Sequence, residues 1–308
     1  MQTITLKNSD LRVSRICMGG CPLGGYGWGE TQDRELTGAV RRALEVGITF
    51  FDTADTYGLG HSETLLGRAL GADRSRVTVA TKFGVRVENG RTFYDNSPRW
   101  LRQACRDSLQ RLGTDYIDLY QIHYRDGVTP LEQVVEALEQ LKAEGMIRYY
   151  GLSNIHGEDI RELRRFSGQF VSFQDEYSLA CRKNEKDIRD FSRELSLTPM
   201  TWGSLGQGIL TGKYDENSVF GADDRRSRPI YENFHGEKLR KNLRIVEVLK
   251  KIAAAHGRTA AETAVQFILD YIPGSVALCG AKRPEQVMGT ADWSLSAQEL
   301  QLLDEVSA

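Results

Sequence analysis

The sequence predicts a single (β/α)8 TIM barrel that spans residues 1–308 and carries a long loop after its seventh strand. Eight short apolar runs, rich in β-branched and aromatic residues, recur along the chain, and segments with helical periodicity separate them. The chain length suits eight such units. An open doubly wound sheet is the alternative, and it is expected to carry the spacing GxGxxG after an early strand. Neither Gly-rich stretch, 24–29 or 203–208, has that spacing.

The apolar runs are the predicted strands. Because they alternate with helical segments, we expect them to lie parallel and to be joined by helical crossovers. The predicted strands are residues 15–19, 49–53, 77–82, 116–123, 149–154, 170–174, 197–202 and 275–280.

Helix punctuation follows the third predicted strand. Ser97 and Pro98 are typical of an N-cap and a first-turn proline, and Gly113 is typical of a helix end. The buried face of this helix is expected at Leu101, Cys105, Leu109 and Leu112.

A second helix is expected from Thr129-Pro130 to Gly145, with Glu132 completing a capping box. Its buried stripe is predicted at Val134, Val135, Leu138 and Leu141. Two further capping boxes are predicted, Thr259 with Glu262 and Ser296 with Glu299.

Residues 203–235 separate the seventh predicted strand from the next strong helix. Loops of this length are uncommon unless they are functional. In a barrel, an insertion after strand seven lies on the face that carries the active site. Its charged segment 223–229 either closes over a ligand or is solvated, and the pattern leaves both open.

Composition limits the classes of partner. The net charge is −2, which gives no electrostatic reason to expect nucleic acid or an anionic membrane as the main partner. The chain has no run of about 18 apolar residues and no secretory h-region. Its five cysteines are scattered without CxxC, which is typical of reduced thiols in a cytoplasmic protein, and the histidine and cysteine spacings do not suit a metal site.

Polar side chains end three successive predicted strands. Asp52, Lys82 and His123 are expected to meet on one rim of the barrel, with Tyr57 five residues beyond Asp52. An ammonium group favours the phenolate form of a nearby tyrosine, and a carboxylate keeps the lysine charged. Such a set can protonate a carbonyl oxygen or deprotonate an alcohol. The structural alternatives are a plain Asp52–Lys82 ion pair, a hydrogen-bonded His123 and a packed Tyr57.

The chain resembles the aldo-keto reductase superfamily over almost its whole length. The matching stretches are GITFFDTADTYGLGHSETLLGRAL, LKAEGMIRYYGLSN, LGQGILTGKY and CGAKRPEQV. The resemblance implies a barrel that binds a nicotinamide dinucleotide without a Rossmann domain. It also implies that Tyr57 is the general acid, that Lys82 lowers the pKa of Tyr57, that Asp52 pairs with Lys82, and that His123 positions the carbonyl.

The resemblance also implies a set of cofactor residues. Ser153, Asn154 and Gln174 would hold the nicotinamide carboxamide, and Trp202 would stack on the ring. The residues that line the pyrophosphate path and the adenosine end would be Leu205, Gln207, Gly208, Gly280, Lys282, Arg283 and Gln286.

Two adjacent cations suit a 2′-phosphate, so Lys282 and Arg283 favour NADPH over NADH, although a solvated loop pair is the alternative. Three positions depart from the family pattern. Cys279-Gly280 replaces the Pro-Gly that the family often has at the end of the last strand. Gly289-Thr290 replaces a Glu-Asn pair near the adenine, and Ile155 replaces the aromatic residue that often follows Ser-Asn. NADH therefore stays possible.

Aromatic residues near the expected site are candidates for the substrate pocket: Tyr26, Trp28, Phe83, Tyr94 and Tyr124. Aromatic walls with a few polar groups suit aldehydes, ketones or keto sugars. The leading hypothesis is an NADPH-dependent carbonyl reductase. The alternatives are an NAD(P)-dependent alcohol or sugar dehydrogenase that uses the same residues, and a weakly catalytic, cofactor-binding regulatory subunit.

Overall fold

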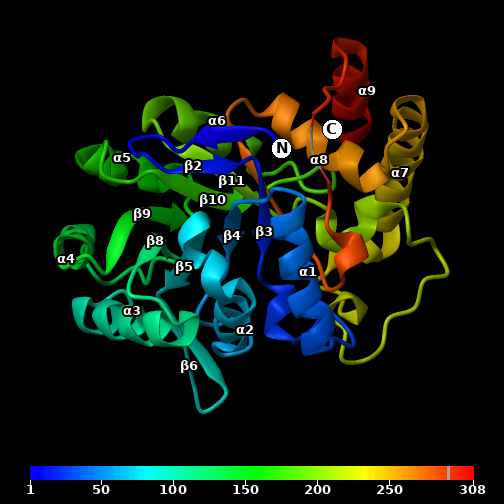
Figure 1. The fold of residues 1–308 in the computed structure, drawn as a ribbon. Helices are drawn as coiled ribbons and strands as arrows, with labels where there is room; N and C mark the ends of the chain where they lie inside the picture. Colours follow the sequence, from blue (N-terminus) through cyan, green and yellow to red (C-terminus); the bar gives the residue numbers. More distant parts are fainter. Residues whose placement is uncertain (290–291) are drawn as a thin grey trace.

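Eight parallel strands close into a barrel in the computed structural model, which describes residues 1–289 and 292–308. Each strand pairs with the next one along the chain, and the last pairs with the first, so the predicted barrel is confirmed (Figure 1). The strands are β3 (Ile16–Gly19), β4 (Phe50–Asp52), β5 (Thr78–Phe83), β8 (Ile117–Ile122), β9 (Ile147–Ser153), β10 (Ser172–Glu176), β11 (Thr198–Trp202) and β12 (Val276–Gly280).

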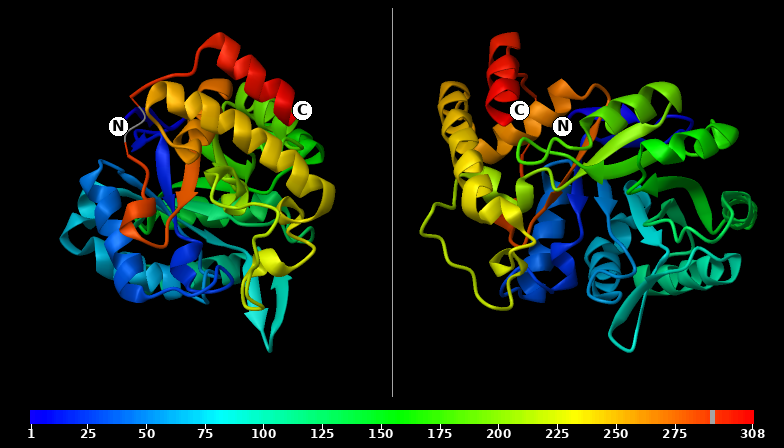
Figure 2. Two further views of the ribbon diagram at one scale, coloured as in Figure 1. Left: turned by 90° about the vertical axis from the view of Figure 1, so that its right-hand side faces the viewer. Right: turned by 180° about the vertical axis from the view of Figure 1, so that it is seen from behind.

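Helices surround the barrel and cover its outer face (Figure 2). They are α1 (Asp33–Glu45), α2 (His61–Leu70), α3 (Pro98–Leu112), α4 (Leu131–Ala143), α5 (Ile160–Leu163), α6 (Glu185–Glu194), α7 (Gly236–His256), α8 (Ala260–Tyr271) and α9 (Ala297–Ser307). Successive strand residues point to opposite sides. Phe50 therefore packs inside the barrel, whereas Phe51 packs between the barrel and the helices.

All four predicted helices are present, and three of their four predicted N-terminal caps are confirmed. The backbone N–H of Trp100 donates to Ser97 Oγ at the start of α3, and capping boxes form at the starts of α8 and α9. The capping box predicted at Thr129 and Glu132 is wrong. Thr129 Oγ1 donates instead to Asp126 Oδ2 (2.7 Å), and Glu132 pairs with Arg165, so α4 begins at Leu131 without a side-chain cap.

Two hairpins that were not predicted lie at opposite ends of the barrel. The hairpin β1 (Thr3–Thr5) and β2 (Arg12–Ser14) covers the end at which the strands begin. The hairpin β6 (Val85–Glu88) and β7 (Arg91–Tyr94) follows β5 and projects from the end at which the strands finish (Figure 1).

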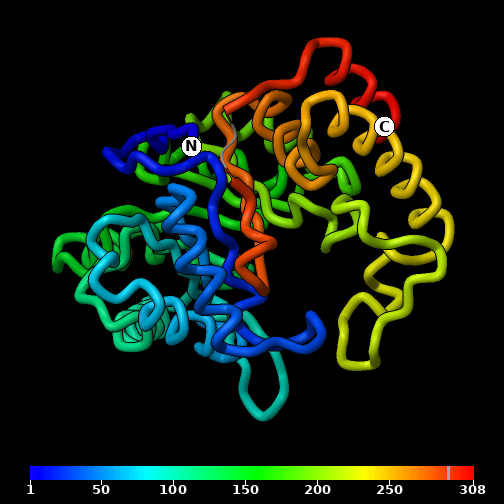
Figure 3. Tube along the Cα trace, turned by 45° about the vertical axis from the view of Figure 1, so that its right-hand side comes forward, coloured from blue at the N-terminus to red at the C-terminus, as the bar shows by residue number. Residues whose placement is uncertain are grey.

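The predicted long loop runs from the end of β11 to α7 and contains three short 3₁₀ turns. It reaches the loop between β3 and α1, because the backbone N–H of Arg225 donates to the carbonyl oxygen of Gly27 (3.1 Å). Figure 3 shows the two segments approaching each other at the open end of the barrel. Among the described residues, no helix is both long enough and apolar enough to cross a membrane. The same residues contain no group of three or more His, Cys, Asp or Glu side chains placed to hold a metal ion.

Candidate active site

A buried lysine lies at the centre of the site. Lys82 on β5 has no exposed surface, and its Nζ donates to Asp52 Oδ1 on the neighbouring strand β4 at 2.5 Å. The same Nζ donates to the carbonyl oxygen of Thr53 (2.9 Å) and to Tyr57 Oη (3.3 Å). The structure thus brings the predicted Asp52, Lys82 and Tyr57 into direct contact, and the three donor hydrogens of the ammonium group all find acceptors.

The carboxylate of Asp52 is held from a second side. Its Oδ2 accepts from Gln174 Nε2 (2.9 Å) and from Gln121 Nε2 (3.0 Å). Burying a charge is costly unless it is paired and hydrogen-bonded, and here both carboxylate oxygens are satisfied. Gln121, the penultimate residue of β8, was not predicted as a site residue. Its role is visible only in the structure, where side chains from several strands meet inside the barrel.

Tyr57 is a neutral phenol in this environment. Burial is the largest cause that raises the pKa of Tyr57 well above its usual range, and the charge of Asp52 adds to it. The resemblance implied that Lys82 lowers the pKa of Tyr57, whereas in the structure the pKa of Tyr57 is raised. The ammonium charge is compensated by Asp52 at 2.5 Å, so it does not outweigh the loss of solvent around the phenol.

His123 follows β8 and completes the group. Its ring meets that of Tyr57 edge to face, with centroids 5.9 Å apart. Burial, followed by the charge of Lys82, lowers the pKa of His123 well below its usual range, so the imidazole is neutral. Its Nδ1 is buried and has no hydrogen-bond partner within residues 1–289 and 292–308. A neutral imidazole has one N–H to donate, which suits the orientation of a carbonyl oxygen.

Aromatic rings extend from His123 toward the surface. Tyr124 stacks on His123 and Tyr94 stacks on Tyr124, with centroid separations of 5.1 Å in both pairs. Tyr94, at the base of the β6–β7 hairpin, is 48% exposed. Asn96 fixes this column, because its Nδ2 donates to the carbonyl oxygen of Tyr124 (3.0 Å).

The other pocket candidates divide into two groups. The prediction that Phe83 lines the pocket is wrong, because the Phe83 side chain is fully buried and stacks on Tyr120 outside the barrel. Alternation along β5 explains this, since Lys82 points inward and Phe83 therefore points outward. Trp28 and Tyr26 lie on the loop between β3 and α1. Trp28 is partly exposed, whereas Tyr26 is exposed and the guanidinium of Arg225 lies over its ring.

Comparison with known proteins assigns the family. The Aldo/keto reductase family matches residues 15–308. The chain belongs to the aldo-keto reductase family. It is 32% identical over 305 residues to the aldo-keto reductase YhdN of Bacillus subtilis (strain 168), covering 97% of this chain and 91% of that protein. It is 32% identical over 303 residues to the NADH-specific methylglyoxal reductase of Escherichia coli (strain K12), covering 93% and 91%.

Two solved structures extend the comparison. The glycerol dehydrogenase AKR11B4 from Gluconobacter oxydans superposes with a TM-score of 0.89 at 33% identity, covering 99% of this chain and 94% of that one. An aldo-keto reductase from Klebsiella pneumoniae in complex with NADPH gives a TM-score of 0.78 at 29% identity, covering 100% and 96%. As a member of this family, the protein is an NAD(P)H-dependent oxidoreductase.

The predicted nicotinamide residues of this aldo-keto reductase lie together. The backbone N–H of Asn154 donates to the carbonyl oxygen of Gln174 (2.9 Å), and its side chain donates to Ser153 Oγ (3.0 Å). Trp202 ends β11, and its Nε1 is buried without a partner in the described part of the chain. Amide, hydroxyl and indole groups at adjacent strand ends fit a carboxamide and a flat ring.

The predicted pyrophosphate segment has an unusual backbone. Gly206, Gln207 and Gly208 all have positive φ (55°, 56° and 104°), so this segment is not a regular helix. The backbone N–H groups of Gly206 and Gly208 donate within the turn, to the carbonyl oxygens of Gly203 (2.7 Å) and Leu205 (2.9 Å). A Cβ atom at Gly206 would lie 2.8 Å from the Cβ of Ala180, so the turn requires glycine there. Leu205 is partly buried against the core, and Gln207 donates to Glu176 Oε1 (3.3 Å).

The predicted adenosine end lies where β12 finishes. Lys282 Nζ donates to the carbonyl oxygen of Trp28 (2.5 Å), and Lys282 N donates to Gln286 Oε1 (2.8 Å). Arg283 pairs with Glu35 on α1 at 3.1 Å, with both side chains exposed. At Gly280, a Cβ would lie 2.8 Å from Pro22 Cγ, so glycine permits close packing against the β3–α1 loop. Thr290, one of the departures from the family pattern, lies outside the described residues.

Asp55, two residues before Tyr57, was not predicted to matter. Burial, followed by the charge of Glu63, raises the pKa of Asp55 to about 8. Its Oδ1 is buried without a partner within residues 1–289 and 292–308. Glu63 is itself fully buried and paired with Arg111 Nε (2.6 Å). The sequence carries no signal for this, because the pKa depends on burial and on a carboxylate eight residues away.

Proposed function

We propose that the protein is an NADPH-dependent reductase of aldehydes, ketones or keto sugars, with Tyr57 as the general acid. One observation supports this assignment above the others. The hydroxyl of Tyr57 lies 3.3 Å from the ammonium group of Lys82, which is held 2.5 Å from the carboxylate of Asp52. A contact set of this kind serves proton transfer and favours an enzyme over a cofactor-binding regulatory subunit.

Each side chain has a separate role in this proposal. Because the pKa of Tyr57 is raised, the phenol holds its proton until a carbonyl oxygen needs it. As that proton leaves, the adjacent Lys82 stabilises the phenolate that forms, and Asp52 keeps the ammonium group in place. The neutral His123 donates a hydrogen bond to the same carbonyl oxygen and so orients the substrate.

The nicotinamide cofactor supplies the hydride when it is bound. Ser153, Asn154, Gln174 and Trp202 would hold its nicotinamide end. The left-handed turn at 206–208 would face the pyrophosphate, and Lys282 with Arg283 would receive a 2′-phosphate. The relatives differ in this respect, because the Klebsiella structure contains NADPH whereas the Escherichia coli relative is named NADH-specific. The two adjacent cations favour NADPH here, and the free cysteines support a reducing, cytoplasmic setting.

The direct test measures NADPH oxidation with a panel of aldehydes, ketones and keto sugars, for the native protein and for Tyr57→Phe. The variant is expected to lose at least 100-fold in kcat while its NADPH affinity, measured by quenching of protein fluorescence, stays within twofold. Phe93→Leu, on the exposed hairpin, is the control and should keep full activity. A Tyr57→Phe protein that retained most of its turnover would exclude Tyr57 as the acid.

Oxidation of an alcohol is the second candidate function. The similarity to a glycerol dehydrogenase, at a TM-score of 0.89, favours including it. The same residues act in reverse, with the phenolate of Tyr57 accepting the alcohol proton. Turnover of glycerol and other polyols with NADP⁺ and NAD⁺, compared with carbonyl reduction under matched conditions, distinguishes the two directions.

A further inference from the structure

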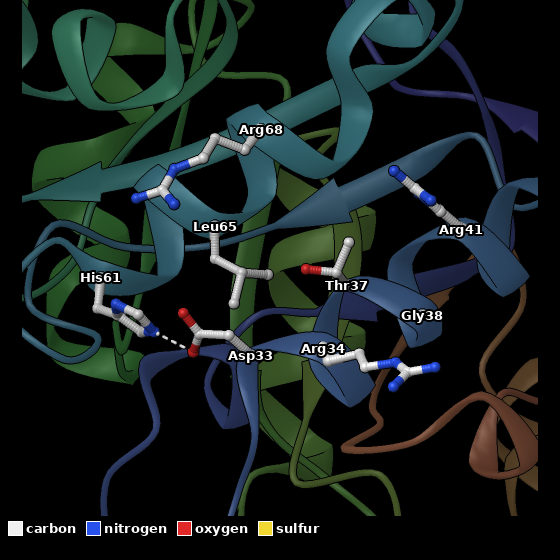
Figure 4. A pocket seen from close by; sticks show the side chains of 8 residues that line it. All are labelled: Asp33, Arg34, Thr37, Gly38, Arg41, His61, Leu65 and Arg68. Carbon is white, nitrogen blue, oxygen red and sulfur yellow. Dashed lines mark hydrogen bonds and ion pairs between the residues drawn. The ribbon is translucent and has the colours of Figure 1, made fainter.

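A hollow of about 400 Å³ lies between α1 and α2, outside the barrel (Figure 4). It shares no residue with the catalytic group or with the predicted cofactor residues. The residues that line it are Asp33, Arg34, Thr37, Gly38, Arg41, His61, Leu65 and Arg68. Its size falls within the range of pockets that hold small molecules.

The lining carries an excess of positive charge. Arg34, Arg41 and Arg68 are exposed, and none forms an ion pair within residues 1–289 and 292–308. The one carboxylate of the lining, Asp33, is already engaged, because its Oδ1 lies 3.0 Å from His61 Nε2. Three guanidinium groups therefore face one carboxylate, and that carboxylate has a partner.

The sequence places these cations together through helix geometry. Arg34 and Arg41 are seven residues apart on α1, so they lie on one face two turns apart. His61 and Arg68 have the same spacing on α2. Figure 4 shows the guanidinium groups spread around the rim, with the Thr37 and Leu65 side chains between them. Like charges that gather without partners repel one another, and an anion relieves this repulsion.

We propose that this cleft binds a small anion that carries at least two separated negative groups. Guanidinium groups bind phosphate and carboxylate oxygens through paired hydrogen bonds, and long exposed side chains can reach inward to do so. One compact ion would meet only part of the rim, whereas a longer anion would meet Arg68 on α2 and Arg41 on α1 together. Thr37 provides a hydroxyl for a further hydrogen bond, and Leu65 an apolar contact.

The cleft shares no residue with the predicted cofactor site, but it borders the adenosine end of that site. Gly38 in the lining packs close to Pro284, the neighbour of Arg283, and Glu35, one residue after Arg34, pairs with Arg283. The cleft also joins two parts of the active face. α1 begins just after the loop that carries Trp28, and α2 begins four residues after Tyr57. The Asp33–His61 contact links the two helix starts.

The test is isothermal titration calorimetry on the full chain at fixed ionic strength, with tripolyphosphate, citrate and inorganic phosphate as probes. We expect tripolyphosphate or citrate to bind with one-to-one stoichiometry and at least tenfold more tightly than inorganic phosphate. The preference between the first two tells a phosphate-bearing ligand from a polycarboxylate. The double variant Arg41→Gln with Arg68→Gln should weaken binding of the preferred probe at least tenfold.

Two controls make the result decisive. Arg244→Gln removes an exposed arginine on α7 that has no ion-pair partner in the described part of the chain, and it should leave binding unchanged. The double variant should keep its melting temperature and its NADPH-dependent turnover, since neither arginine contacts the catalytic group. Equal binding by the native protein and the double variant, or no saturable binding of either long anion, would overturn the proposal. Loss of binding in saturating NADPH would place the anion in the cofactor site and would also overturn it.

Discussion

A neutral phenol, Tyr57, and a neutral imidazole, His123, lie side by side in a place that excludes water, and we expect their protonation states to set the pH range of carbonyl reduction. In the role proposed for it, Tyr57 acts as an acid only while it is protonated, and its pKa is raised well above its usual range. His123 is neutral because its pKa is lowered well below its usual range. The ordinary values are about 10 for tyrosine and about 6.5 for histidine.

Carbonyl reduction is therefore expected to be independent of pH from about 6.5 to about 10, because both groups keep their working forms between their ordinary values. Asp55 becomes charged above about pH 8, and that charge raises the pKa of Tyr57 further, so it does not bring the alkaline limit down. The measurement is kcat/KM for reduction across this range. A loss of tenfold or more below pH 9 would contradict the assignment of Tyr57 as a buried neutral acid.

Asp55 also makes a prediction about stability. Its folded pKa, about 8, lies above the value near 4 that an unfolded chain gives. The folded protein therefore binds the additional proton, and stability is lost as pH rises from about 4 through about 8. Asp55→Asn removes this loss. At pH 8.5 the free energy of unfolding of the variant should therefore exceed that of the native protein by at least about 1.4 kcal/mol, the equivalent of a shift of one pKa unit. At pH 5 the difference should be much smaller.

Urea denaturation at the two pH values measures this effect, with Asp223→Asn, in the long loop, as the control. A stability difference that is equal at pH 5 and pH 8.5 would show that Asp55 does not titrate in this range.

Among the elements, the β6–β7 hairpin has the clearest link to substrate choice. It carries Tyr94, the outermost ring of the column that begins at His123. Stacked aromatic pairs are worth about 0.5–1.5 kcal/mol beyond the area that they bury. A planar substrate that stacks on this column would gain that amount, whereas a small aldehyde would not reach it.

Tyr94→Ala is therefore expected to raise KM for an aromatic aldehyde such as benzaldehyde by about 2- to 12-fold, the equivalent of that energy. KM for a small aliphatic aldehyde should change less than twofold. Val87→Ala, also exposed on the hairpin, should change neither value. Steady-state kinetics with the two substrates tests this, and equal effects of Tyr94→Ala on both would remove the hairpin from substrate recognition.

The same elements show what sequence reasoning reached and what it missed. All eight barrel strands were predicted, most of them to within a residue or two, because alternation of apolar runs and helix signals is a long-range pattern. The β6–β7 hairpin was missed although Asn89-Gly90, both with positive φ, is a strong turn signal between alternating residues. The prediction brought Asp52, Lys82 and His123 to one rim. It could not find Gln121, because the sequence does not distinguish this residue from any other polar residue in a buried strand. Its contact with Asp52 joins residues that are far apart in the sequence.

At the scale of the whole molecule, the residues that close the core and the residues proposed to carry out the reaction lie at opposite ends of the barrel. The proposed catalytic side chains lie where the strands end, and the β1–β2 hairpin closes the end at which the strands begin. Leu6, Leu11 and Val13 of this hairpin segment are buried in the same cluster as Phe50 and Leu119 inside the barrel. A barrel of this kind tolerates change at one end without altering the geometry at the other.

Leu11→Ala tests this separation. Leu11 is 2% exposed, and removing a buried leucine side chain costs about 2–5 kcal/mol through lost burial and the cavity that remains. The free energy of unfolding, from urea denaturation, should fall by that amount. At 25 °C, kcat and KM for carbonyl reduction should stay within twofold of the native values, because no catalytic side chain contacts this end. Val128→Ala, 83% exposed on the opposite face, is the control and should change neither property. A fall in kcat that accompanied the loss of stability in Leu11→Ala, at a temperature where the variant is fully folded, would show that the two ends of the barrel are coupled.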